Sequence, residues 1–133
     1  MRFIKSWAPA IIMMAAIFSF SSIPSEDMPS FGGFDFSIKK FGHAFGYALL
    51  ALAYQRGLKH TVQVQGSSIS SILHRNRSLV AWFLAILFAV TDEFHQSFVP
   101  GRNPSIWDIL LFDNGGAILG LLINNLLAKK VKS

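Results

Sequence analysis

The sequence predicts an all-α protein that crosses a membrane with a bundle of about four helices. Apolar residues make up 52% of the 133 residues, charged residues make up only 14%, and the mean hydropathy is +0.44. Long apolar runs alternate with short polar segments, and a membrane-spanning helix needs about 20 residues. A chain of this length therefore has room for about four spans and little room for a soluble domain.

The first two expected helices cover about residues 5–21 and 39–56. The first follows Arg2 and Lys5 and is apolar almost throughout. A basic start and a short apolar core also fit a secretory signal peptide, but the hydrophobicity of the downstream chain favours an uncleaved first helix. The segment between the two helices is rich in Gly, Pro, Ser and Phe, which predicts a loop at the membrane interface.

The last two expected helices cover about residues 79–98 and 106–127. The segment that precedes them, residues 57–78, contains basic residues and no acidic residue. We expect it to be a flexible cytoplasmic loop. The Pro100–Gly101 turn ends the third helix, and Pro104 keeps the next connection short and stiff. The last two helices are therefore expected to form a short hairpin.

The distribution of charges predicts the orientation of the bundle. If both termini and residues 57–78, with the adjoining Arg56, lie on one side, nine of the twelve Lys and Arg residues lie there. All seven acidic residues then fall in the opposite loops or in the helix halves nearest to them. Cytoplasmic loops carry an excess of Lys and Arg, so both termini are expected in the cytoplasm. The basic residues then flank membrane helices, and nucleic acid is not an expected partner.

Ionisable residues interrupt the apolar sequence near the extracytoplasmic ends of the helices. Asp92, Glu93 and His95 lie near the end of the third helix, where a charged residue is costly unless it faces protein. Alanines recur at every fourth position on the same helix, and Gly116 and Gly120 repeat this spacing on the fourth. Small residues let membrane helices approach closely, so we expect the third and fourth helices to pack tightly through these surfaces.

The chemistry of this polar cluster stays open between several alternatives. His95 with its neighbouring carboxylates can form a general base with its orienting group, or the same side chains can bind a divalent metal. The HExxH spacing is absent, and only Asp92 and His95 have the i, i+3 offset seen in di-iron bundles. The chain has no cysteine, which excludes thiolate ligands and a cysteine nucleophile. Metal and cofactors are therefore undetermined, and a purely structural hydrogen-bond network remains an alternative.

Residues from the other helix ends are expected to complete one recessed site that opens to the outside. His43 and Tyr47 share one face of the second helix. Arg102, on the turn, is suited to bidentate binding of a phosphate or carboxylate, unless it is a counter-ion of Asp108 or Asp92. The candidate catalytic residues are Asp92, Glu93 and His95, and the candidate binding residues are His43, Tyr47, Gln96, Arg102, Ser105, Asp108 and Asp113.

These residues resemble the motifs of the VanZ-like family of small bacterial membrane proteins. The resemblance implies a multi-helix envelope protein. The founding member of the family is linked to low-level resistance to teicoplanin, a glycopeptide antibiotic that acts on cell-wall precursors. The resemblance does not carry over a defined reaction. The matching residues are Asp92-Glu93-Phe94-His95-Gln96-Ser97-Phe98-Val99-Pro100-Gly101-Arg102, Ser21-Ser22-Ile23-Pro24, Lys40-Phe41-Gly42-His43 with Tyr47, and Ser105, Asp108, Gly116-Ala117 and Gly120.

Two positions differ from the pattern of this family. Relatives often have an aspartate where this chain has Lys39, so an Asp–His pair within the second helix is not expected here. In the fourth helix the second polar position commonly falls one turn after the aspartate, but that place is Phe112, and Asp113 follows one residue later. One residue turns a side chain by about 100° around an α-helix, so Asp113 is expected to replace the family's polar group only approximately.

Three classes of function fit these residues. An enzyme would act on a phosphorylated or wall-linked lipid, with Glu93 or His95 as the base and Arg102 holding the anion. A binding protein would recognise the same head group without turnover. A proton-coupled exporter fits least, because the acids gather at one end of the bundle. We expect recognition of a membrane lipid or lipid-linked wall precursor in the bacterial cytoplasmic membrane, and the oligomeric state stays open.

The expected orientation can be tested with topology reporters. A reporter fused after Ser133 should lie in the cytoplasm, because four spans return the chain to the side on which it began. A pair of reporters that are active on opposite sides of the membrane measures this. An extracytoplasmic signal from the fusion after Ser133 would contradict the four-helix count.

Overall fold

The computed structural model of the chain describes residues 2–62 and 68–131. Every regular element in these two ranges is helical, and neither range contains a strand, which confirms the predicted all-α class. The elements are α1 (Arg2–Ser21), η1 (Ser25–Asp27), η2 (Gly32–Phe34), α2 (Asp35–Val62), α3 (Ser68–Arg75), α4 (Arg77–Gln96), the π-helical segment η3 (Asp108–Asp113) and α5 (Asn114–Lys130).

Three helices of the described chain are long and apolar enough to cross a membrane. They cover Ile4–Ser21, Arg77–Gln96 and Asp108–Lys130. Their lengths match the thickness of a bilayer core, for which about 20 helical residues are needed. Large apolar side chains such as Phe83 and Leu119 lie exposed on these helices, as expected for surfaces that contact lipid. These are the features of an integral membrane protein.

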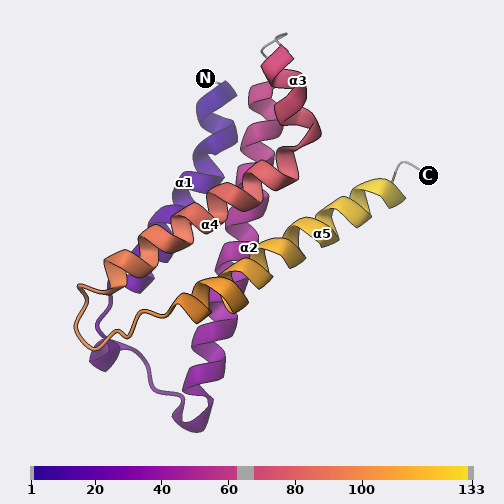
Figure 1. Ribbon diagram of the computed structural model, residues 1–133. Coiled ribbons are helices and arrows are strands. Elements are labelled where there is room, and N and C mark those ends of the chain that lie inside the picture. The colour runs from indigo at the N-terminus through magenta and orange to yellow at the C-terminus, as the bar shows by residue number, and fades with distance from the viewer. Residues whose placement is uncertain (1, 63–67, 132–133) are drawn as a thin grey trace.

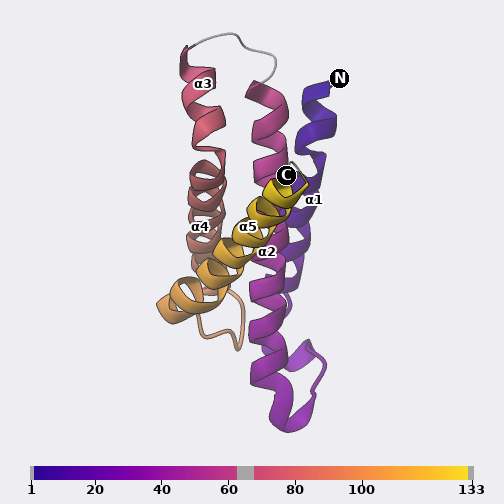
Figure 2. The ribbon, with the colours of Figure 1, turned by 90° about the vertical axis from the view of Figure 1, so that its right-hand side faces the viewer.

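The second helix, α2, occupies the centre of the bundle. The helices α1, α4 and α5 all pack against it (Figures 1 and 2), and Tyr47, Leu50 and Ala51 are fully buried. A helix enclosed by protein can carry polar and small residues that a lipid-facing helix cannot. This explains why α2 is less apolar than the three spanning segments. The expected four-helix bundle therefore consists of a more polar central helix and three apolar helices around it.

The start of α1 and the helix α3 lie at one end of the bundle, and α5 runs obliquely toward that end (Figures 1 and 2). The α1–α2 connection and the turn that follows α4 lie at the opposite end. This arrangement agrees with an even number of membrane crossings. The side of the membrane that each end faces stays a prediction.

The segment 57–78, expected to be a loop, is helical in its described residues apart from a turn at Asn76. The helix α2 extends to Val62, and α3 follows after residues 63–67, which lie outside the described part of the chain. The end of α2 is held by α1, because Trp7 Nε1 donates a hydrogen bond to Thr61 Oγ1 over 2.8 Å. This tertiary contact outweighs the polar composition from which a loop was predicted.

The face of α4 that carries the alanines and the acidic residues lies toward the protein interior, as predicted. Its exposed side chains, which include Leu79, Phe83, Leu87 and Phe94, are large and apolar. The inner face therefore combines small residues, which allow close packing, with the polar residues of the expected site. The buried residues of α4 are Ala81, Ala85, Ala89, Asp92, Glu93 and Gln96.

The glycines of α5 pack against α2. A Cβ atom on Gly116 would lie 1.9 Å from the carbonyl oxygen of Ala44, and a Cβ atom on Gly120 would lie 3.1 Å from the Cβ atom of Ala48. The predicted contact of these glycines with the preceding transmembrane helix is wrong. The reason is that α5 runs across α2 (Figure 1) and meets it backbone to backbone at the two glycines.

The turn after α4 is fixed to the α1–α2 connection. The backbone N–H of Ser25 donates to the Pro100 carbonyl over 3.3 Å, and Ser25 Oγ donates to the Gly101 carbonyl over 2.6 Å. Gly101 has a φ of 71°, a conformation that glycine adopts without strain. The predicted Pro100–Gly101 turn is therefore present, and it sets the position of Arg102.

The close contact between α2 and α5 can be tested by adding single methyl groups. Gly116→Ala should lower the free energy of unfolding by about 1–3 kcal/mol or prevent folding, because the methyl group would meet the backbone of Ala44. Gly115→Ala is the matched control, since no atom outside its own helix lies within 4 Å of the position of its Cβ. Thermal unfolding of both variants in detergent measures the difference, and equal melting temperatures would contradict the described packing.

Candidate functional site

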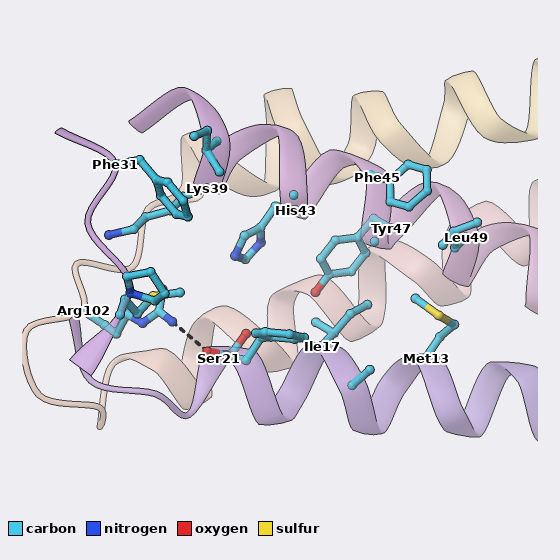
Figure 3. A pocket seen from close by; sticks show the side chains of 17 residues that line it. Met13, Ile17, Ser21, Phe31, Lys39, His43, Phe45, Tyr47, Leu49 and Arg102 are labelled. Atoms are coloured by element: carbon cyan, nitrogen blue, oxygen red, sulfur yellow. Dashed lines mark hydrogen bonds between the residues drawn. The ribbon is translucent and has the colours of Figure 1, made fainter. Parts of the chain in front are cut away.

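A cavity of about 480 Å³ lies between α1 and α2 (Figure 3). The α1–α2 connection contributes Phe31 to one end of its wall, and Met13 and Leu49 line the other end. Most of the wall is apolar, since aliphatic and aromatic side chains make up the greater part of the lining. Its volume falls within the range of about 300–1,000 Å³ that is typical of small-molecule sites.

The polar side chains that line the cavity are all hydrogen-bond donors. They are Ser21, Lys39, His43, Tyr47 and Arg102, and two of them carry a positive charge. No carboxylate of the described residues contributes to the lining. Figure 3 shows the three polar residues of α2 in a row along the helix. Their four-residue spacing separates them by about 6 Å each along the helix axis.

A buried carboxylate lies behind His43. The Nδ1 atom of His43 is 3.3 Å from Oδ1 of Asp113, and the two side chains form an ion pair when the histidine is protonated. Asp113 is only 1% exposed, and it does not line the cavity. This carboxylate can therefore orient the imidazole ring without competing for a ligand.

The π-helical segment η3 brings Asp113 to this position. The backbone N–H of Asn114 donates to the carbonyl of Ile109, five residues earlier, which is the hydrogen-bond pattern of a π-helix. A π turn holds one residue more than an α turn, so Asp113 comes one full turn after Asp108. The expected rotation of about 100° away from the site is thus absorbed by the backbone. The π turn thus compensates for the shift from Phe112 to Asp113, and the role of Asp113 as a binding residue stays a prediction.

A second buried carboxylate, Asp92, lies behind Ser21. Its Oδ2 atom accepts hydrogen bonds from Ser21 Oγ over 2.7 Å and from Gln96 Nε2 over 3.0 Å. Gln96 Nε2 also lies 3.3 Å from Ser21 Oγ. All three side chains are buried. They connect α4 to the end of α1 beside the cavity.

The other two residues predicted to be catalytic face different surroundings. Glu93 Oε2 accepts a hydrogen bond from the backbone N–H of Ser105 over 2.9 Å. His95 Nε2 lies 3.0 Å from Ser22 Oγ, and its ring stacks on Phe18 with a centroid distance of 4.0 Å. Neither residue lines the cavity. The structure therefore does not bring the three catalytic candidates into one group, and their roles stay predictions.

Arg102 lies at the mouth of the cavity and also holds the end of α1. Its Nε and Nη2 atoms donate to the carbonyls of Ile23 and Phe20 over 3.0 and 2.8 Å. A cation at a helix C-terminus is favoured by the helix dipole. Partial burial lowers the pKa of Arg102, but a guanidinium stays charged at neutral pH. The alternative role as a counter-ion of Asp108 is not observed, because Asp108 pairs with Lys40.

Among the described residues, Tyr47 Oη and Asp92 Oδ1 are buried polar atoms beside the cavity without a hydrogen-bond partner. The atoms His43 Nδ1 and Asp113 Oδ1 are also buried, and they lie 3.3 Å from each other. Buried polar atoms are nearly always paired in folded proteins, so the Tyr47 hydroxyl, which lines the cavity, is a candidate contact for a bound polar group. Among the described residues, no three His, Asp or Glu side chains are arranged as metal ligands. Whether this site binds a metal ion therefore stays open.

Two polar residues of the cavity lining, Lys39 and Ser21, are not among the predicted site residues. Lys39 precedes His43 and Tyr47 at the same four-residue interval. Helical periodicity alone therefore places it on their face. The contact between Ser21 and Asp92 joins distant parts of the chain and has no comparable signal in the sequence.

The role of Asp92 as a shared acceptor can be tested by two substitutions. Asp92→Ala should destabilise the protein by about 1–3 kcal/mol, because Ser21 and Gln96 would lose their buried acceptor. Asp92→Asn is the matched control, since its amide oxygen can replace Oδ2. Thermal unfolding in detergent compares the two variants. If both unfold at the temperature of the unaltered protein, the hydrogen bonds of Asp92 do not stabilise the helix ends.

Comparison with known proteins agrees with these features. The family model described as VanZ/LLP1 matches residues 6–128. This range includes nearly all of the described structure from α1 to α5, with every residue that lines the cavity. No curated protein and no solved structure matches the chain. As the motif resemblance predicted, the chain belongs to the VanZ/LLP1 family.

Proposed function

We propose that this protein binds an anionic lipid or a lipid-linked cell-wall precursor in the cavity between α1 and α2. The distribution of polar groups supports this proposal. The lining contains two cations, Lys39 and Arg102, and no carboxylate of the described residues, whereas Asp92 and Asp113 lie outside the lining. A ligand with a negatively charged head group matches the donors, and the apolar remainder of the cavity suits a hydrocarbon chain.

The head group is proposed to contact Lys39 and Arg102. Among the described residues, no carboxylate pairs with Lys39, whereas the adjacent Lys40 pairs with Asp108. The charge of Lys39 is thus available to a ligand. Arg102 uses Nε and Nη2 for the carbonyls of α1, and its Nη1 can donate to a phosphate oxygen, because a guanidinium carries five N–H groups.

The hydrocarbon chain is proposed to lie along the apolar end of the cavity. Met13 and Ile17 of α1 and Phe45 and Leu49 of α2 line this end. Phe45 is 66% exposed and Leu49 is 37% exposed, so the cavity wall continues onto the outer surface of the bundle. A lipid can therefore enter sideways from the bilayer, without leaving its membrane leaflet.

We propose that this site lies at the extracytoplasmic side of the cytoplasmic membrane, with both termini in the cytoplasm, because Lys and Arg are in excess at the opposite end of the bundle. Lipids and lipid-linked wall precursors are present at this surface in bacteria. Binding such a molecule would change how the envelope presents the precursors on which glycopeptide antibiotics act. We propose this as the link between the site and teicoplanin resistance.

A membrane-embedded hydrolase or transferase acting on a phosphorylated lipid is the second candidate. The pair formed by His43 and Asp113 favours it, because a carboxylate beside a histidine holds the ring as a general base. His43 lines the same cavity as Lys39 and Arg102. If this pair catalyses a reaction, the His43→Gln variant should still bind the ligand but should form no product.

Native mass spectrometry of the protein released gently from its own membranes tests the binding proposal. A phospholipid or polyprenyl-phosphate adduct should be present, and Lys39→Gln should lower its occupancy about tenfold through loss of a charge-assisted contact. Lys40→Gln is the matched control, because it removes the same charge from the adjacent residue outside the cavity lining. Equal adduct levels in the two variants, or no adduct in the unaltered protein, would contradict the proposal.

A further inference from the structure

Tyr47 provides a hydrogen-bond donor deeper in the cavity than the proposed head-group contacts. The residue is 0% exposed to solvent, it lines the cavity, and its hydroxyl group has no hydrogen-bond partner. Figure 3 shows the hydroxyl oxygen directed from α2 toward α1, into the space between the two helices. A buried hydroxyl without a partner is unfavourable, so a ligand that supplies an acceptor at this point is favoured over one that does not.

The surroundings of Tyr47 favour a neutral acceptor. The carboxylate of Asp113 lies against His43, one turn before Tyr47 on α2, and the carboxylate of Asp92 lies against Ser21 at the facing end of α1. Both are buried, so their fields are weakly screened, and a second anionic group beside Tyr47 would be repelled. A carbonyl oxygen accepts a hydrogen bond without carrying a negative charge. The donor of Tyr47 therefore fits a carbonyl oxygen better than a second phosphate.

The depth of Tyr47 matches the ester level of a glycerophospholipid. Lys39 lies at the mouth, and His43 and Tyr47 follow about 6 and 12 Å further along the axis of α2. Side chains on a helix lean toward its N-terminus, so the hydroxyl of Tyr47 is directed back toward the mouth. In a glycerophospholipid the glycerol backbone separates the phosphate from the acyl-ester carbonyls. In a polyprenyl phosphate the phosphate is attached directly to hydrocarbon, which offers no acceptor at this depth.

We propose that the cavity selects an ester-linked anionic glycerophospholipid, and that Tyr47 Oη donates a hydrogen bond to one of its acyl-ester carbonyls. This inference rests on the proposed function and narrows its ligand class. The phosphate contacts Lys39 and Arg102, the ester lies between His43 and Tyr47, and one acyl chain follows Ile17 and the apolar end of the cavity. Tyr47 is then a residue that determines specificity.

Three lipid probes with the same phosphate head group test the inference on the purified full chain in detergent. The probes are dioleoyl phosphatidic acid, its diether analogue without ester carbonyls, and undecaprenyl phosphate. A native mass spectrometry titration gives the affinity for each. The ester lipid should bind about fivefold more tightly than the diether, which is the typical effect of one hydrogen bond. Tyr47→Phe should remove this difference and leave the affinity for the diether unchanged.

The possible outcomes separate the inference from the proposed function. Equal affinities of the unaltered protein for the ester and the diether would overturn the inference and leave lipid binding intact. Tighter binding of undecaprenyl phosphate than of the ester lipid would also overturn it. Failure of all three probes to bind would contradict the proposed function itself. Tyr47→Phe should fold normally, because it removes a hydroxyl that has no partner in the protein, and its melting temperature checks this directly.

Discussion

Two buried carboxylates determine how this bundle is arranged. Asp92 and Asp113 are each 1% exposed, although they lie in helices whose other surfaces are apolar enough to face lipid. A carboxylate in such a helix has to be covered by protein, and its oxygen atoms require donors. The end of α1 covers Asp92, and the central helix α2 covers Asp113. The more polar composition of α2 follows from this requirement.

The two carboxylates act on the cavity through other residues. Asp92 holds Ser21, and Asp113 lies against His43, and both of these partners line the cavity. The negative charges of Asp92 and Asp113 therefore lie behind the cavity wall, while the cations Lys39 and Arg102 line it. This arrangement gives the site a positive character. It is the physical basis for proposing an anionic ligand.

Much of the fold could be predicted because single helices follow simple periodic rules. The alanine spacing of α4 identified its buried face, and the carboxylates on that face were expected to be buried. Contacts between helices were harder to predict. Gly116 was assigned to the wrong partner, since its neighbour depends on how α5 crosses α2. Glu93 and His95 are close in sequence, but each residue turns the helix by about 100°, so they reach different partners.

The π-helical segment η3 has a consequence for how this region tolerates changes in length. It takes up one additional residue between Asp108 and Asp113 while α5 keeps its register on α2 through Gly116. Insertion of a residue into a regular α-helix would rotate everything beyond it away from its partner. Here the wider π turn accommodates the additional residue within one turn of the helix, so the helix beyond it is not rotated. The polar side chain before α5 and the packing surface within α5 can therefore vary independently of each other.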